Sequence, residues 1–220
     1  RAIAMTVAVI LGFVSTQARG DVAVYTQPPN PAGGQYPSAW YAPDGLDSDT
    51  YVWDSFSLAS SSAISQIQWR GAYTNYLSGA GRAPVYDFTI SIYGSIAGNS
   101  QPNIGAGPLV SYDIGSNAGE TQVGTFGGVI MYDYHYSLPS PFQATAGTVY
   151  WVQIEAWQGL TPLYYWPPDW SIASGTGGNG SHFRRITGGG YASLTGDCAF
   201  TMLASSLPNY TINATASPTN

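Results

Sequence analysis

Lysine is absent from this chain of 220 residues, and only 8% of the residues are charged. Six arginines face twelve acidic residues, which gives a formal net charge of −6. Proteins bind nucleic acid and anionic membranes through lysine and arginine side chains that displace counterions. The composition therefore excludes nucleic acid as a partner and argues against an anionic membrane surface.

Cysteine and histidine are almost as scarce. Cys198 is the only cysteine, so no intramolecular disulfide can form and the fold must depend on its core. Its segment, DCAFTML, predicts a small buried residue in a last strand. His135 and His182 are the only histidines, and no G-x-S-x-G turn is present, so a serine triad is not expected. A structural zinc site, which takes four N or S ligands, is not expected either.

Long apolar runs are missing apart from one near the N-terminus, Ile3–Val14. This run is shorter than the roughly 20 residues that a bilayer core requires. A positive residue, Arg1, precedes it, and small residues at cleavage spacing follow up to Gly20. These features are typical of a secretory signal peptide. We therefore predict a signal peptide over residues 1–20, a secreted or cell-surface protein, and no stable transmembrane segment in the mature chain.

Helical periodicity is missing after the signal peptide, and apolar residues alternate with polar ones between Gly, Pro, Asn and Asp. The clearest predicted strands are Val22–Thr26, Tyr51–Leu58, Ala63–Arg70, Tyr86–Tyr93, Leu109–Ile114, Gln122–Phe126, Ile130–Leu138, Val149–Trp157 and Ala199–Leu203, with weaker ones at Leu163–Trp166 and His182–Ile186. About 9–11 short strands predict an all-β fold, a jelly-roll-like β-sandwich. We expect the sandwich over residues 21–204 and a polar tail or linker over 205–220.

The alternation also assigns the two faces of a strand. Within Val149–Trp157, the even-numbered Val152 and Ile154 are expected to point inward, and the odd-numbered Glu155 outward with its tryptophan neighbours. Within Ile130–Leu138, His135 alternates with Asp133 and Ser137 on one face. We interpret that face as a polar patch.

Aromatic side chains are concentrated in one 20-residue span. The candidate ligand-binding residues in it are Trp151, Trp157, Tyr165, Trp166 and Trp170. Aromatic faces stack on the apolar faces of sugar rings, and exposed Trp and Tyr anchor many interfaces. The alternative is that these large side chains fill the open ends of the sandwich. Both interpretations are open at this point.

Carboxylates suggest two further hypotheses. Asp44, Asp47 and Asp49 cluster in the long loop Gln27–Asp49, which suits calcium, a hard cation with six to eight oxygen ligands. The alternative is that they cap the following strand through Asx turns. Glu155 is the candidate acid of a carbohydrate-active hydrolase, which needs a second carboxylate. Its potential partners on predicted strands are Asp54, Asp87 and Asp133.

Four stretches resemble a family of secreted bacterial sandwich domains found in PEP-CTERM-type surface proteins. The stretches are YVWDSFSLASSSAISQIQWRG (Tyr51–Gly71), YDFTISIYG (Tyr86–Gly94), YDYHYSLPSPFQATAGTVYWVQIEA (Tyr132–Ala156) and GDCAFTML (Gly196–Leu203). The resemblance implies the sandwich fold and a surface location, and it carries no assigned activity. One departure is that no Pro-Glu-Pro motif follows the last stretch.

These observations predict a secreted, non-catalytic β-sandwich with a binding or structural role at the cell surface. A neutral polysaccharide or glycan is the expected partner. The alternatives are an exported carbohydrate-active hydrolase that uses Glu155, and a structural subunit of a surface or matrix layer held by homotypic contacts. No cofactor other than calcium is expected.

The calcium hypothesis makes a direct prediction. If Asp44, Asp47 and Asp49 jointly hold the ion, the melting temperature rises with calcium, because a ligand that binds only the native state stabilises it. Thermal unfolding in excess chelator and in calcium at about 1 mM, an affinity range of extracellular calcium modules, measures this effect. Equal melting temperatures would leave only the strand-capping role.

Overall fold

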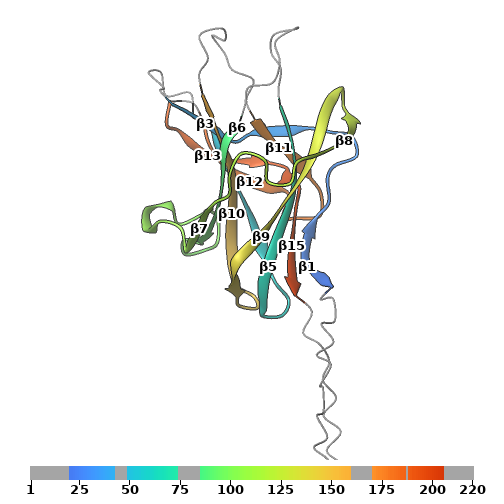
Figure 1. Ribbon diagram of the computed structural model, residues 1–220. Helices are drawn as coiled ribbons and strands as arrows, with labels where there is room; N and C mark the ends of the chain where they lie inside the picture. Colours follow the sequence, from blue (N-terminus) through green and yellow to red (C-terminus); the bar gives the residue numbers. More distant parts are fainter. Residues whose placement is uncertain (1–19, 43–48, 74–84, 160–169, 187, 206–220) are drawn as a thin grey trace, which may run out of the picture.

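The computed structural model describes residues 20–42, 49–73, 85–159, 170–186 and 188–205, and all elements named below lie within these ranges (Figure 1). The strands are β1 (Asp21–Gln27), β2 (Gln35–Pro37), β3 (Ala39–Ala42), β4 (Tyr51–Ser57), β5 (Ser62–Tyr73), β6 (Val85–Gly94), β7 (Val110–Asp113), β8 (Thr121–Phe126), β9 (Val129–Ala144), β10 (Val149–Gly159), β11 (Trp170–Gly175), β12 (Ser181–Arg185), β13 (Tyr191–Thr195), β14 (Asp197–Cys198) and β15 (Phe200–Ser205). A short 3-10 helix, η1 (Ile104–Ala106), lies between β6 and β7.

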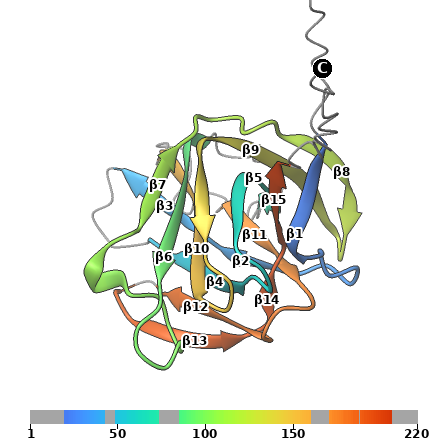
Figure 2. The same ribbon diagram turned by 90° about the horizontal axis from the view of Figure 1, so that it is seen from below.

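Two antiparallel sheets pack together, which confirms the predicted all-β sandwich (Figures 1 and 2). The seven-stranded sheet has the order β13-β12-β4-β10-β6-β7, and β3 pairs in parallel with the end of β10. In the eight-stranded sheet, the long β5 pairs with β9 on one side and with β15 and then β11 on the other. None of the helices in the described ranges is long and apolar enough to span a bilayer.

The strands number fifteen within the described residues, more than the predicted nine to eleven. The additional ones, such as β2, β3 and β14, have only two to four residues. Segments of that length are too short for alternation to be visible in the sequence. They become strands because a longer strand is already present beside them, as β11 is beside β2 and β14.

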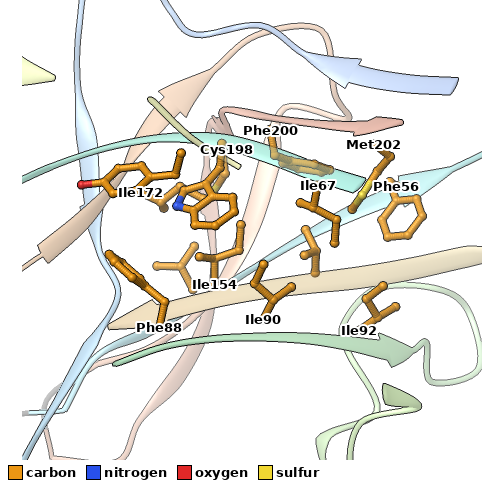
Figure 3. Close-up of a cluster of buried hydrophobic side chains, with 14 of the residues drawn as sticks. Phe56, Ile67, Phe88, Ile90, Ile92, Ile154, Ile172, Cys198, Phe200 and Met202 are labelled. Carbon is orange, nitrogen blue, oxygen red and sulfur yellow. The ribbon is translucent and has the colours of Figure 1, made fainter. Parts of the chain in front are cut away.

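The main core lies between the two sheets (Figure 3). Phe88, Ile90 and Ile92 of β6 face it from the seven-stranded sheet, as the alternation predicts. From the other sheet, Ile67 of β5 and Phe200 of β15 pack against them, also almost fully buried. Burial of one such side chain stabilises the fold by about 1.5–3 kcal/mol.

Trp170 completes this core at the start of β11, with none of its surface exposed. Its indole nitrogen donates a hydrogen bond of 3.2 Å to the Tyr134 hydroxyl, and its ring meets Phe88 edge-on at 5.1 Å. Gly71 of β5 makes room for the ring, because a Cβ there would lie 2.5 Å from the indole. A larger residue at position 71 therefore displaces Trp170 from the core.

A buried polar cluster closes one side of the core around Asp54 of β4. Its carboxylate accepts the backbone N–H groups of Ser55 at 2.7 Å and Cys198 at 2.5 Å. Cys198 is buried, as its sequence context predicts, and burial raises the pKa of its thiol. The imidazole of His182, which pairs with Asp54 across the strands, bonds the Gly196 carbonyl oxygen through Nδ1 at 2.8 Å. A thiol held in its protonated form is a poor nucleophile.

Asp54 makes the stability of the fold depend on pH. Burial raises its pKa from 3.8 to about 7, so the folded state favours the protonated form. This contribution to stability is present below pH 4 and is lost as the pH rises toward 7, by on the order of 4 kcal/mol. Burial lowers the pKa of His182, which acts in the opposite direction at acid pH.

The two contributions are separated by urea unfolding of the wild type and Asp54→Asn between pH 4 and pH 8, a range that starts just above the ordinary pKa of 3.8 and contains the raised value of about 7. Asp54→Asn is expected to be less stable at low pH, since it loses a carboxylate oxygen acceptor, but to lose less stability on going to pH 8. Parallel curves for the two proteins would contradict the raised pKa of Asp54.

Candidate functional site

The outer face of the seven-stranded sheet carries a second layer of aromatic side chains, on the side away from the main core. Trp53 of β4, Trp151 of β10 and Phe183 of β12 form its buried part. The strand register places Phe183 directly opposite Trp53, and the pairing of β4 with β10 brings Trp151 onto the same face. We call these three residues, with Tyr191 of β13, the outer aromatic layer.

Tyr191 is the exposed member of the outer aromatic layer, with 51% of its surface accessible. Its ring stacks on Phe183 at 5.9 Å and also contacts Trp53 at 6.2 Å. These contacts fix the plane of the ring while one side stays open to solvent. An exposed, pre-oriented ring of this kind is suited to stacking on a flat ligand surface at low entropic cost.

A groove of about 310 Å³ opens beside Tyr191. The connection between β6 and β7, which contains η1, forms one wall, and the β12–β13 hairpin forms the other; Figure 2 shows these two segments at the same corner of the molecule. Ile104 of η1 packs against the outer aromatic layer. Gln101 and Asn103 add amide groups to the lining. The groove therefore combines an aromatic floor with polar groups that bind hydroxyls.

Glu155 lies on the same sheet face, in the middle of β10. Its carboxylate accepts a hydrogen bond of 2.7 Å from the Gln153 amide. Burial raises the pKa of Glu155 to about 7, and the negative charges of Asp49 and Asp113 add to the rise. Glu155 is opposite Thr89, which in turn is opposite Asp113, so two strand spacings, roughly 10 Å, separate the backbones of the two acids.

Asp113 was not among the partners that the sequence suggested for Glu155, and the three that were are placed differently. Asp54 faces the main core, and Asp133 belongs to the eight-stranded sheet, so neither shares a face with Glu155. Asp87 shares the face and lies opposite Trp157. Period-2 alternation placed all these acids on strands, but it carries no information about which sheet a strand joins.

The five predicted ligand-binding aromatics have different positions. Tyr165 and Trp166 lie outside the described residues, so their role stays a prediction. Trp170 and Trp151 are 0% and 2% exposed, and the Trp151 indole donates to the Ser95 hydroxyl at 2.6 Å. Neither offers a free ring face, because Trp170 is packed in the main core and Trp151 is covered within the outer aromatic layer.

Trp157 is partly exposed at the end of β10, and it belongs to a small aromatic group of its own. Its ring stacks on Trp40 of β3 at 5.2 Å, with an angle of 8° between the planes. Tyr86 of β6, 48% exposed, meets it edge-on at 5.4 Å. Of the described candidates, Trp157 alone keeps an accessible position on the outer face.

Of the three calcium candidates, only Asp49 lies within the described residues. Asp44 and Asp47 lie outside the described residues. Among the described residues, no group of three or more His, Cys, Asp or Glu side chains is placed to hold a metal ion. Asp49 accepts a hydrogen bond of 2.9 Å from the Tyr51 hydroxyl, next to the start of β4. Calcium binding therefore stays a prediction.

Tyr191 and Phe183 were not among the predicted site residues. Phe183 lies in a weak strand, and Tyr191 follows three glycines, so neither has strong local alternation. The signal that was available is the pair Phe183 and Arg185, which are two residues apart and so share a strand face. The partner of Phe183, Trp53, is about 130 positions away in the sequence, and only the β4–β12 pairing brings the two together.

The sequence of this chain matches no model of a known protein family and no curated protein. The likeness to PEP-CTERM-type surface proteins therefore stays a prediction.

Proposed function

We propose that this protein is an exported, non-catalytic sandwich that binds a neutral glycan in the groove beside Tyr191. The observation that carries the proposal is the outer aromatic layer, which presents one exposed ring, Tyr191, at the edge of an open groove. The C–H faces of a sugar ring are apolar and stack on such a ring, while its hydroxyls need hydrogen-bond partners. Gln101 and Asn103 supply amide partners beside it.

Charge supports a neutral ligand. The chain has no lysine and a net charge of −6, so a polyanionic glycan would be repelled. The groove lining contains no charged side chain among the described residues, so a strongly charged ligand finds no partner there. The apolar run Ile3–Val14 supports export, which would bring the groove into contact with extracellular polysaccharides.

The first prediction of this proposal concerns Tyr191. Tyr191→Ala removes the stacking ring and is expected to weaken glycan binding about tenfold, since an aromatic contact contributes about 0.5–1.5 kcal/mol beyond its buried area. Tyr191→Phe keeps the ring and is expected to bind nearly as the wild type does. The measurement is titration calorimetry with a soluble neutral polysaccharide selected from a panel of β-glucan, xylan, glucomannan and dextran.

Leu194→Ala is the matched control, because Leu194 is also exposed on β13, at 38%, but alternation places it on the opposite face from Tyr191. Thermal unfolding of each variant verifies that the fold is retained. Equal weakening by Tyr191→Ala and Leu194→Ala, or no binding by the wild type to any polysaccharide of the panel, would contradict the proposal.

A hydrolase acting on the same class of ligand is the second candidate, and the raised pKa of Glu155 is the observation that favours it. A general acid must hold its proton near neutral pH, and an inverting enzyme needs a second carboxylate roughly 6.5–9.5 Å away. The described acids on this face include Asp87, on the neighbouring strand β6, and Asp113, about two strand spacings from Glu155. Glu155 does not line the groove, however, so binding without catalysis remains our main proposal.

Glu155→Gln separates the two functions. We expect the wild type to release no reducing sugar from the panel and the variant to bind glycan unchanged. We also expect the variant to melt at a higher temperature at pH 8, because the folded state disfavours the charged form of a carboxyl whose pKa is raised from 4.5 to about 7. This stability difference should vanish near pH 4, where the carboxyl is protonated in both states. Sugar release that is lost in Glu155→Gln would establish the hydrolase instead.

A further inference from the structure

The outer face of the eight-stranded sheet holds a cleft of about 350 Å³. Its floor consists of side chains brought together by strand register. Thr201 of β15, Gln68 of β5 and His135 of β9 form one lateral row. Arg70 and Asp133 form the next row. The neighbours of these residues along each strand, such as Trp69 and Tyr134, face the main core, so the rows point away from it.

One wall of the cleft is the loop that contains Gly119 and Glu120, and two hydrogen bonds fix this loop to the sheet. The Glu120 carboxylate accepts hydrogen bonds from the hydroxyls of Tyr73 at 2.7 Å and Tyr134 at 2.8 Å. The preceding Gly119, at φ +65°, lies so close to the imidazole of His135 that an added Cβ would overlap the ring. The loop and the imidazole are therefore fixed relative to each other, and the cleft is preformed.

The charges in the cleft neutralise each other. The Arg70 guanidinium donates two parallel hydrogen bonds to the Asp133 carboxylate, at 2.6 and 3.0 Å. The planar guanidinium also lies over the Phe126 ring at 5.3 Å. A bidentate pair of this kind is geometrically specific and leaves no net charge for an ionic ligand. An apolar ligand would have to desolvate the pair and its polar neighbours at a cost.

Three groups on the floor keep hydrogen-bonding capacity directed at solvent. The exposed His135 imidazole has no hydrogen-bond partner within the described part of the chain. The Gln68 amide nitrogen donates to Gln66 at 2.8 Å, which leaves its oxygen as an acceptor. The Thr201 hydroxyl shares a single hydrogen bond of 2.9 Å with Thr26. Imidazole, amide and hydroxyl groups thus line a neutral cleft whose volume falls within the range of small-ligand sites, about 300–1,000 Å³.

We propose that this cleft is a second binding site for a neutral, hydroxyl-rich ring, that is, a sugar unit of a glycan. It is independent of the groove beside Tyr191 and goes beyond the function proposed above. The two sheets pack face to face, so their outer faces point in opposite directions. With a glycan on each face, one molecule joins two polysaccharide chains.

The test uses the folded, isotopically labelled protein and NMR titration with four soluble probes: cello-, xylo-, manno- and maltotetraose. At least one probe is expected to shift the Gln68 side-chain amide and Thr201 backbone signals saturably, in the wild type and equally in Tyr191→Ala. The double variant Gln68→Ala/His135→Ala is expected to bind that probe in the cleft at least about tenfold more weakly. Both residues are exposed, so the fold should tolerate their replacement.

Gln143→Ala is the control, because Gln143 is exposed on the same long strand, β9, outside the cleft. Cleft signals that respond to no probe while Tyr191 responds would overturn this inference and leave the first groove standing. Responses in the cleft alone would support it and overturn the proposed function of the groove. The absence of any response at both sites would overturn both proposals. Equal loss of binding in Gln143→Ala and in the double variant would also overturn the proposal of a second site in the cleft.

Discussion

The central strand β10 buries side chains on both of its faces, and the rest of the molecule is arranged around this constraint. Val152 and Ile154 enter the main core, while Trp151 and Gln153 are buried on the outer side. On the outer side, the side chains of Trp53, Phe183 and Ile104 pack with Trp151 and form a second cover. The groove beside Tyr191 lies at the edge of this second cover.

Local alternation predicted the orientation of β10 correctly, but not its burial. Glu155 and Trp151 do point away from the main core, as their odd-numbered positions indicate. The sequence could not show that Trp151 is covered, because its cover includes Phe183 and Ile104, which come from distant segments. The same limit explains Trp170: it lies next to a Pro-rich stretch that suggests an exposed loop, yet Gly71, about 100 positions earlier, opens a place for it in the core.

Polar contacts were less predictable than apolar ones. The alternation of Asp133 with His135 did indicate a polar patch, and both residues line the described cleft. The pattern could not predict the wall of the cleft, because Glu120 appears in the sequence as an ordinary turn residue. Its role depends on two tyrosine hydroxyls from β5 and β9, which reach the same carboxylate oxygen only after these strands have paired.

The character of both candidate sites follows from the scarcity of charged residues in the sequence. With 8% charged residues, the outer faces of the sheets must rely on hydroxyl, amide and aromatic groups to interact with anything. In the groove these groups surround Tyr191. In the cleft, the opposite charges of Arg70 and Asp133 pair with each other. Neutral, hydroxylated polymers match such surfaces, because each hydroxyl exchanges water for a protein partner without the desolvation of a free charge. The bridging of two chains that we propose rests on these two faces, which point in opposite directions.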